Sequence, residues 1–445
     1  MNPPHTVRIA NMNRRTFLQT TAATAAGMAG LLASHTPPGY AQQRELKILT
    51  WAHFVPASDE ELKRQAAEWS KASKVRVRVD LVAHLQLPAK KAAEVQAQAG
   101  HDMLHLYIDD PDLYYDQLAT IDDVAGELSR QAGGFFDEEL FRYRGQHFKA
   151  IPWYFISFPI AYRMDVLDKI GERVPNTWDD MLRVGKKAKA EGHPVGIQIS
   201  HCFDSNAILR GILWSYGAKI TDKDAKTITI NSPETVKAVE YVKALFTEAM
   251  EQEVLSWDDA NNNRCLNGGR CSMILNPISA YESARDAKAV IPGTDRQIHE
   301  VINHDLPPEG PAGRHISASY NMFGIWNFSR QIDAAKDFLR YHFAEEQQNR
   351  FIEASRGYNQ PLLKKFADHK IWSTNPKYAF APKIGEFTHP PSWPAAPHAA
   401  SQVAMNLYVI PDMFANAVTG RMATAEAIAW AEKELKDIYE GRKKG

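Results

Sequence analysis

Short apolar segments recur at intervals from residue 45 onward. Residues 45–51 form an apolar run that predicts a buried strand, and residues 75–81 alternate apolar with polar side chains, the period of a strand with one wetter face. A third strand is predicted over 101–108, and two more over 194–200 and 272–276. Because helical patterns separate these segments, they predict βαβ units and a mainly parallel sheet.

Amphipathic segments with helical spacing occupy the intervals. Ser58 and Glu61 fit the pattern of a capping box ahead of the first helix, and Thr177 and Asp180 fit the same pattern ahead of another. Pro233 marks the first turn of a further helix. More helices are predicted over about 86–99, over 332–354 and around 428–438. The fold class that follows is α/β.

The N-terminal segment has the features of an export signal. Arg14 and Arg15 precede Phe-Leu and a weakly apolar run over 20–33, which resembles a twin-arginine signal peptide. The run is too short for a membrane span, which takes about 20 strongly apolar residues. Small residues predict cleavage after Ala41, so we expect residues 1–41 to direct export to the periplasm by the twin-arginine route. The alternative interpretation is an alanine-rich N-terminal helix.

The charge balance excludes one class of function. The chain of 445 residues carries 52 basic and 53 acidic side chains, a net charge of −1, and without residues 1–41 the balance is 49 to 53. A protein that binds nucleic acid through its phosphates needs an excess of basic groups. No nucleic-acid partner is therefore expected.

Three cysteines are too few for a disulfide scaffold or a cysteine-rich metal site. Cys265 and Cys271 flank a segment with two glycines that lets the chain turn back, and an oxidising compartment favours a bond between them. Two reduced, buried cysteines are the alternative.

Four segments of the chain carry patterns of a known family. Residues 145–154 lead into 160–167, residues 174–181 contain Pro-Asn-Thr-Trp, and residues 266–273 end in Cys-Ser-Met. The fourth comprises 306–314, 323–325, 334–338 and 357–361. In this order, behind an export signal and spread over most of 46–440, they resemble the extracellular solute-binding proteins of ABC importers, in the class that includes maltose- and sugar-binding proteins.

The resemblance implies a two-lobe periplasmic-binding-protein fold of type II, whose interleaved lobes are joined by hinge crossovers and enclose a ligand cleft. Lobe one is expected over 42–155 and 302–355, and lobe two over 156–301 and 356–445. Hinge closure on a solute gives a shape that a transporter can bind. The implied function is delivery of a small solute, namely a sugar, sugar acid or polyol, to the membrane permease subunits of an ABC importer. A monomer without a cofactor is expected.

Candidate ligand residues follow the ends of the predicted strands and the lobe crossings. Ligands in such sheets bind beyond the carboxyl ends of strands, and a sugar needs aromatic rings for its C–H faces and polar groups for its hydroxyls. The candidates are Trp51, His53, Asp109, Asp110, Trp153, Tyr154, His201, Asp204, Asn276, Tyr281, Tyr320, Asn321, Tyr358 and Asn359. For each of them, packing in the core or at a helix start is the alternative.

Other functions stay open from the sequence. His101 and His105, or the paired Tyr114 and Tyr115, are candidates for metal uptake, but Met103 lies between the histidines and there is no histidine-rich loop. An amine or an organic acid is an alternative solute, and a secreted carbohydrate-active enzyme is an alternative class. The sequence contains no H-E-x-x-H, G-x-S-x-G, P-loop or dinucleotide motif, so we assign no catalytic residue and no metal ligand.

Overall fold

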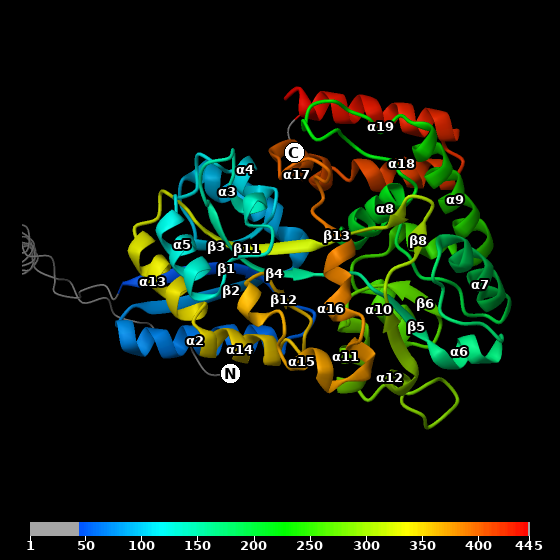
Figure 1. The fold of residues 1–445 in the computed structure, drawn as a ribbon, viewed down its shortest axis with the longest axis horizontal. Coiled ribbons are helices and arrows are strands. Elements are labelled where there is room, and N and C mark those ends of the chain that lie inside the picture. The colour runs from blue at the N-terminus through cyan, green and yellow to red at the C-terminus, as the bar shows by residue number, and fades with distance from the viewer. Residues whose placement is uncertain (1–43, 444–445) are drawn as a thin grey trace, which may run out of the picture. The chain divides into compact units, whose positions relative to one another are not determined.

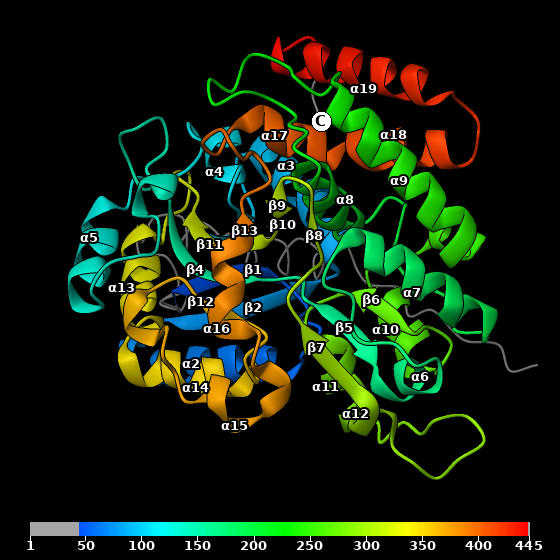
Figure 2. The ribbon, with the colours of Figure 1, turned by 45° about the vertical axis from the view of Figure 1, so that its right-hand side comes forward.

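The computed structural model describes residues 44–443. The predicted signal with Arg14 and Arg15, and the cleavage site after Ala41, lie outside these residues. From Glu45 onward the chain forms one compact unit, in which helices cover two β-sheets of unequal size (Figures 1 and 2). The predicted α/β class is confirmed. None of the described helices combines the length and apolar composition that a membrane crossing requires.

The larger sheet contains β1 (Glu45–Trp51), β2 (Arg76–Val82), β3 (Met103–Tyr107), β4 (Ala150–Ile156), β11 (Ser319–Ile325) and β12 (Gln360–Pro361). Their order is β12-β4-β11-β3-β1-β2. Strand β1 is parallel to β2 and β3, whereas β11 is antiparallel to β3 and β4, and β12 is antiparallel to β4. The sheet is therefore mixed, and the prediction of a mainly parallel sheet is wrong. The carboxyl ends of β1 to β4 therefore lie at the same edge as the amino ends of β11 and β12.

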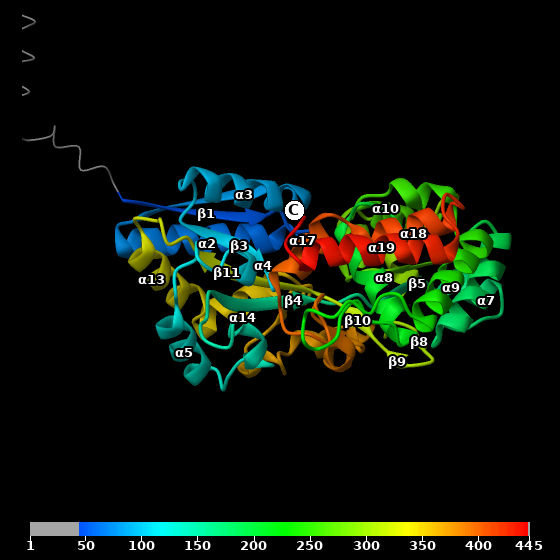
Figure 3. The same cartoon turned by 90° about the horizontal axis from the view of Figure 1, so that it is seen from above.

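Helices cover both faces of this sheet. Their bounds are α2 (Ala57–Ser73), α3 (Leu87–Ala97), α4 (Asp110–Leu113), α5 (Asp122–Gln131), α13 (Ile332–His342) and α14 (Glu345–Ala354). Helix α3 lies on one face, and α2 and α14 lie on the other (Figures 1 and 3). Buried Leu62 and Trp69 of α2 join the core, as their spacing predicts.

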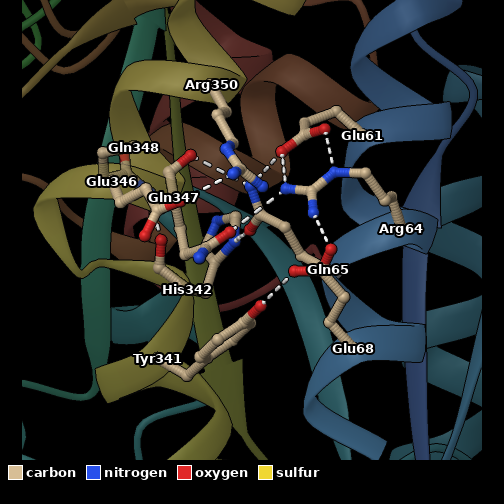
Figure 4. A network of polar contacts seen from close by, with 10 residues as sticks. All are labelled: Glu61, Arg64, Gln65, Glu68, Tyr341, His342, Glu346, Gln347, Gln348 and Arg350. Atoms are coloured by element: carbon tan, nitrogen blue, oxygen red, sulfur yellow. Dashed lines mark hydrogen bonds and ion pairs between the residues drawn. The ribbon is translucent and has the colours of Figure 1, made fainter.

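A polar network joins α2 to α13 and α14, which come much later in the chain (Figure 4). Arg64 Nη2 donates to Gln347 Oε1 at 3.2 Å, and Gln65 Nε2 donates to the Gln347 carbonyl at 2.9 Å. Tyr341 OH donates to Glu68 Oε2 at 2.9 Å. These contacts hold two segments that are 282 positions apart against each other.

The smaller sheet contains β5 (Ile160–Arg163), β6 (Met273–Leu275) and β7 (Ile302–Asp305) in the order β6-β5-β7, and both pairs are antiparallel. The helices around it are α6 (Met164–Lys169), α7 (Trp178–Ala190), α8 (Phe203–Ser215), α9 (Pro233–Ala249), α10 (Asn261–Asn267), α11 (Ser279–Asp286) and α12 (Ile298–Val301). A disulfide joins Cys265 to Cys271, with 5.3 Å between the Cα atoms. Of the two alternatives for these cysteines, the bond is the one that forms.

The last helices connect the parts of the fold around the two sheets. They are α15 (Ile371–Thr374), α16 (Ala381–Ile384), α17 (Ala399–Asn406), α18 (Val409–Val418) and α19 (Thr424–Tyr439). Helix α18 packs on α8, α9 and α19, and α17 packs on α4 of the larger-sheet side. At that contact the His398 N–H and Ser401 Oγ donate to the two oxygens of Asp109 at 2.9 and 2.8 Å. Short pairs β8 (Glu309–Gly310) with β9 (Gly313–Arg314) and β10 (Ile316–Ser317) with β13 (Thr388–His389) complete the strands.

Two predicted helical features differ in the structure. The capping box at Ser58 is not formed, because α2 begins at Ala57, so that Ser58 lies inside the helix, and Glu61 bonds to Arg64 instead. The helix predicted over 332–354 is two helices with a break after His342. Gln348 Nε2 donates to the His342 carbonyl at 2.8 Å, which satisfies a carbonyl left free at the end of α13. The Thr177–Asp180 capping box is confirmed.

Three predicted strand or lobe assignments also differ. In the segment 194–200 only Val195 forms a β-bridge, to Met273, while the Ile199 N–H bonds to the Val254 carbonyl in a loop. Strand β7 pairs with β5 of the smaller sheet, although the predicted boundary places residues from 302 onward in lobe one. Strand β12 pairs with β4 of the larger sheet, although the predicted boundary places residues from 356 onward in lobe two.

Candidate functional site

A cavity lies where the edges of the two sheets face each other. From the larger-sheet side it is lined by a first wall, Trp51, Phe54 and His84, which follow the carboxyl ends of β1 and β2. From the smaller-sheet side it is lined by a second wall, Phe203, Asp204, Asp259, Asn276, Pro277 and Ser279. Residues at the chain crossings complete it: Ile156, Phe158, Ser319 and Tyr358. This is the edge at which strand topology predicts a site.

The two walls stand close together. About 30 Å³ of this inner cavity is open to a water-sized sphere, whereas ligand pockets usually offer about 300–1,000 Å³. An outer cavity of about 210 Å³ shares His84 and Phe203 with it and adds Tyr107, Asn206 and Tyr408. A solute larger than a few water molecules therefore enters the inner cavity only when the walls separate.

Hydrogen bonds behind the first wall fix its indole ring. Trp51 Nε1 donates to Tyr154 OH at 3.2 Å, and Tyr154 OH lies 2.7 Å from His53 Nε2. His53 Nδ1 in turn lies 2.5 Å from Asp59 Oδ1. Every donor in this series of hydrogen bonds finds an acceptor when His53 donates to Asp59 and accepts from Tyr154. Burial raises the pKa of Tyr154 well above its usual range, so its hydroxyl keeps the proton that it donates. From Trp51 Nε1 to Asp59 Oδ1, each group in this series of hydrogen bonds has its partner within the series.

The second wall presents carboxylates and amides. Asp204 Oδ2 accepts from Asn262 Nδ2 at 2.8 Å and from Gln198 Nε2 at 3.2 Å. Asp259 Oδ1 accepts the Asp204 backbone N–H at 2.9 Å. Asn262 Nδ2 also donates to Asn276 Oδ1 at 2.9 Å. The amides therefore hold two neighbouring carboxyl groups at the cavity surface.

Burial and like charge set the electrostatics of this wall. Burial raises the pKa of Asp204 well above its usual range, and the neighbouring Asp259 charge adds to the rise. His84 of the first wall approaches Asp259, with 3.7 Å from Nδ1 to Oδ2, but burial lowers the pKa of His84. An imidazole that stays neutral does not compensate the carboxylates.

Aromatic rings surround the carboxyl groups. The ring centroids of His84 and Phe203 are 5.3 Å apart, those of Trp51 and His84 are 5.5 Å apart, and those of Tyr107 and Phe203 are 5.7 Å apart. Among the described residues, the buried Tyr107 hydroxyl has no hydrogen-bond partner. Rings and polar groups of this kind suit a solute that has both apolar faces and hydrogen-bonding groups.

Four sequence-predicted residues line the inner cavity: Trp51, Asp204, Asn276 and Tyr358. Asp204 is the second residue of α8, and Asn276 directly follows β6. Tyr358 follows Gly357, whose φ of 82° turns the chain toward β12. A Cβ at Gly357 would stand 2.6 Å from the Trp372 ring, so the turn requires glycine.

Other predicted residues lie behind the first wall and have partners of their own. Trp153 is 1% exposed and packs on Phe323 and Phe351 at centroid distances of 4.4 and 4.5 Å. Asn321 Oδ1 lies 2.9 Å from His105 Nε2. His53 and Tyr154 belong to the network behind Trp51, Asp110 pairs with buried Lys91, and Asp109 holds the start of α17.

The remaining predicted residues lie elsewhere. Tyr320 lines a separate cavity of about 350 Å³ together with Phe155 and Trp372. Tyr281 packs against other aromatic rings of the smaller-sheet side. His201 is exposed and pairs with Asp412 at 2.7 Å, and Asn359 is buried. Which of all these residues contact a solute stays a prediction.

The lining residues that were not predicted include Phe54, His84, Phe203 and Asp259. His84 follows the strand over 76–82, so the rule of strand ends applied to that strand would have found it. Asp259 lies in a loop after a short 3-10 helix (Gln252–Ser256) and follows no strand, and no local pattern marks it.

The metal candidates have other roles. His101 Nε2 lies 2.9 Å from Asp80 Oδ2, and its Nδ1 bonds to Glu94. His105 Nδ1 lies 3.3 Å from Thr50 Oγ1. Within residues 44–443, no three His, Cys, Asp or Glu side chains gather into a group that could hold a metal ion.

Comparisons with known proteins agree with this architecture. Residues 56–349 match the family model described as "Bacterial extracellular solute-binding protein". A protein of Deinococcus radiodurans named "Probable ABC transporter-binding protein" is 24% identical over 308 residues, which are 65% of this chain and 68% of that protein. Because the family match spans more than half of the chain, the chain belongs to the bacterial extracellular solute-binding proteins.

Solved structures share the fold. The maltose-bound MalE3 of T. maritima aligns with a TM-score of 0.75 and 21% identity over 88% of this chain and 99% of that chain. A solute-binding protein of Agrobacterium radiobacter in complex with ribitol aligns with a TM-score of 0.72 and 16% identity over 89% of this chain and 98% of that chain. The predicted two-lobe fold of the maltose-binding type is therefore confirmed, and the protein is a solute-binding protein of an ABC transporter.

Proposed function

We propose that this solute-binding protein works in the periplasm and captures a sugar or polyol between its two walls. The observation that supports this most directly is the inner cavity, where aromatic rings from both walls stand beside the carboxyl and amide groups of the second wall. Rings cover the C–H faces of a sugar, and carboxylates and amides bond its hydroxyls. Relatives of the same fold that bind maltose and ribitol support the same solute class.

Capture proceeds by hinge closure. The walls separate to admit the solute and close on it, because only separation makes room in a cavity of about 30 Å³. The closed monomer then docks on the permease subunits of an ABC importer. The protein binds without a cofactor and without catalysis, and export by the twin-arginine route brings it to the periplasm.

A thermal-unfolding screen over sugars, sugar acids and polyols tests the proposal, with calorimetry on every hit. A solute present at a hundred times its Kd stabilises the folded state by about 2.7 kcal/mol. If only metals or organic acids without hydroxyl groups stabilise the protein, the proposal fails. Incubation with oligosaccharides should give no turnover, and hydrolysis would point to an enzyme instead.

A matched pair of variants tests the place of the site. Phe203 lines both cavities, whereas Phe136 is 38% exposed and lines the separate cavity near Tyr320. We expect Phe203→Ala to weaken the binding of the identified solute at least about tenfold, or about 1.4 kcal/mol. Phe136→Ala should leave the affinity unchanged. Equal affinities in both variants would contradict the placement of the site between the walls.

A further inference from the structure

The charges that line the two cavities have one sign. Asp204 and Asp259 line the inner cavity, and among the described residues that line it the only basic side chain is His84, whose pKa burial lowers. Within the described part of the chain, no lysine or arginine is among the residues that line either cavity. A solute that reaches the second wall therefore meets two carboxyl groups and no fixed positive charge.

Two buried cations contact residues that line the outer cavity, and both have other partners. Lys91 is fully buried and pairs with Asp110 beneath the ring of Tyr107. Arg210 is buried in α8, where its Nη1 donates to Asn206 Oδ1 at 2.6 Å and to the Asn206 carbonyl at 3.2 Å. Neither side chain reaches Asp204 or Asp259 with a hydrogen bond, so the charge of the second wall is not neutralised from behind.

Two buried carboxyl groups in contact cannot both be ionised without a nearby cation. Asn262 and Gln198 donate to Asp204, and the Asp204 N–H donates to Asp259, but these donors carry no charge. The hydroxyl groups of a neutral sugar could likewise bond the carboxyl groups without balancing them. A protonated amine would supply both a donor and the missing charge.

The aromatic lining favours the same kind of group. Trp51, Phe54 and Phe203 line the cavity beside the carboxyl groups, and aromatic faces attract an ammonium group through their quadrupoles. We infer that the solute is an amine-bearing polyol, such as an amino sugar or an amino alditol, whose ammonium group binds between Asp204 and Asp259. This inference rests on the proposed function, because it takes the cavity between the walls as the solute site.

Matched sets of small solutes test the inference. Each set keeps one carbon frame and changes one group: glucosamine, glucose and glucuronate; galactosamine, galactose and galacturonate; and 1-amino-1-deoxysorbitol, sorbitol and gluconate. Calorimetry measures the affinity of each solute at pH 6, where the amines are protonated. In at least one set, we expect the amine to bind ten or more times as tightly as its neutral and acidic counterparts.

The possible failures separate the two proposals. If in every set that binds a neutral or acidic member binds as tightly as its amine, or if only neutral solutes of the wider screen bind, the inference is wrong and the proposed function stands. If no polyhydroxylated solute binds, or if binding does not respond to Phe203→Ala, the proposed function fails as well.

Adjacent aspartates provide matched variants. Asp259 is 7% exposed and faces the cavity, whereas Asp258 is exposed and pairs with Arg264 at 2.9 Å. Asp259→Asn should remove the preference for the amine over its neutral counterpart, and Asp258→Asn should keep it. A preference that survives Asp259→Asn in the folded variant would overturn the inference.

Proton release from the unaltered protein gives a second test that needs no variant. An ammonium between the carboxyl groups lets both ionise, so binding at pH 6 should release a proton, seen as a buffer-dependent binding enthalpy. The titratable groups that face the pair are His84, Tyr107, Cys202, Tyr358 and Tyr408. Proton uptake, or an amine enthalpy that is the same in all buffers, would contradict the inference.

Discussion

The two walls of the cavity use their polar groups differently. Behind the first wall, a series of hydrogen bonds runs from Trp51 through Tyr154 and His53 to Asp59. In the second wall, Asp204 and Asp259 carry acidic groups that amides hold in place without balancing their charge. A satisfied network stabilises the fold, whereas an unbalanced charge gains most from a ligand. The first wall therefore positions an aromatic surface, and the second wall sets the chemistry of the solute.

The largest effect should come from the core behind the first wall. Trp153→Ala removes a ring that packs on Phe323 and Phe351 at 1% exposure, which should lower the free energy of unfolding by about 3–5 kcal/mol. Urea unfolding measures the loss. Trp372→Ala, at a half-buried ring, is the control and should cost much less.

The same variant decides whether Trp153 belongs to the site. Because Trp153 does not line the inner cavity, we expect the folded fraction to bind the solute with unchanged affinity. A tenfold loss of affinity at a temperature where the variant is folded would show that the first wall extends to this ring.

The stability of the fold should depend on pH through Asp109. This carboxyl group is buried like those of the second wall, but it has hydrogen-bond donors like the groups behind the first wall. Burial raises the pKa of Asp109 to about 7, although donors from Ser401 and His398 oppose the rise. The folded state therefore keeps this proton up to neutral pH, while the unfolded state loses it near pH 4. The stability that the proton provides is complete below about pH 4 and is lost as the pH rises toward 7.

Asp109→Asn measures this contribution. For a shift of this size the free energy of unfolding should fall by about 4 kcal/mol at most between pH 4 and 7, and the asparagine variant should lack that part of the slope. The comparison is the difference between the two proteins at each pH, in urea and without solute. Asp204, whose pKa is also raised, should keep a slope of the same sign in the variant. Parallel stability curves for the two proteins would contradict the raised pKa of Asp109.

Strand ends predicted part of the site. Trp51 at the end of β1 follows from the alternation of strands and helices, because the parallel strands β1, β2 and β3 bring their carboxyl ends to one edge. Asn276 directly follows β6 of the antiparallel smaller sheet, so only its place at a strand end was predictable. The same rule does not tell which way a side chain turns at that edge. His53 turns inward to Asp59, where it becomes part of the wall's support.

Contacts between distant parts of the chain determine the features of the site and fold that the sequence did not predict. Asp259 reaches the cavity from an irregular segment whose position depends on distant contacts, such as that of the Ile199 N–H with the Val254 carbonyl. The division of the chain between the sheets was misjudged at β7 and β12 for the same reason, because a short strand has no local signal for the partner it pairs with.

The smallest effect should come from one hydroxyl group behind the first wall. Tyr154→Phe keeps the ring but leaves Trp51 Nε1 and His53 Nε2 without their shared partner. An unsatisfied buried polar group costs about 1–3 kcal/mol, and water entering the opened cavity can recover part of it, so we expect a loss near the lower end. Tyr115→Phe is the control, because that half-buried ring contacts the Arg144 and Lys149 cations through its face. Solute affinity should fall by less than for Phe203→Ala, since Trp51 keeps its packing and loses only its anchor. If Tyr154→Phe and Phe203→Ala lowered the solute affinity equally, the first wall, like the second, would contribute to binding the polar groups of the solute.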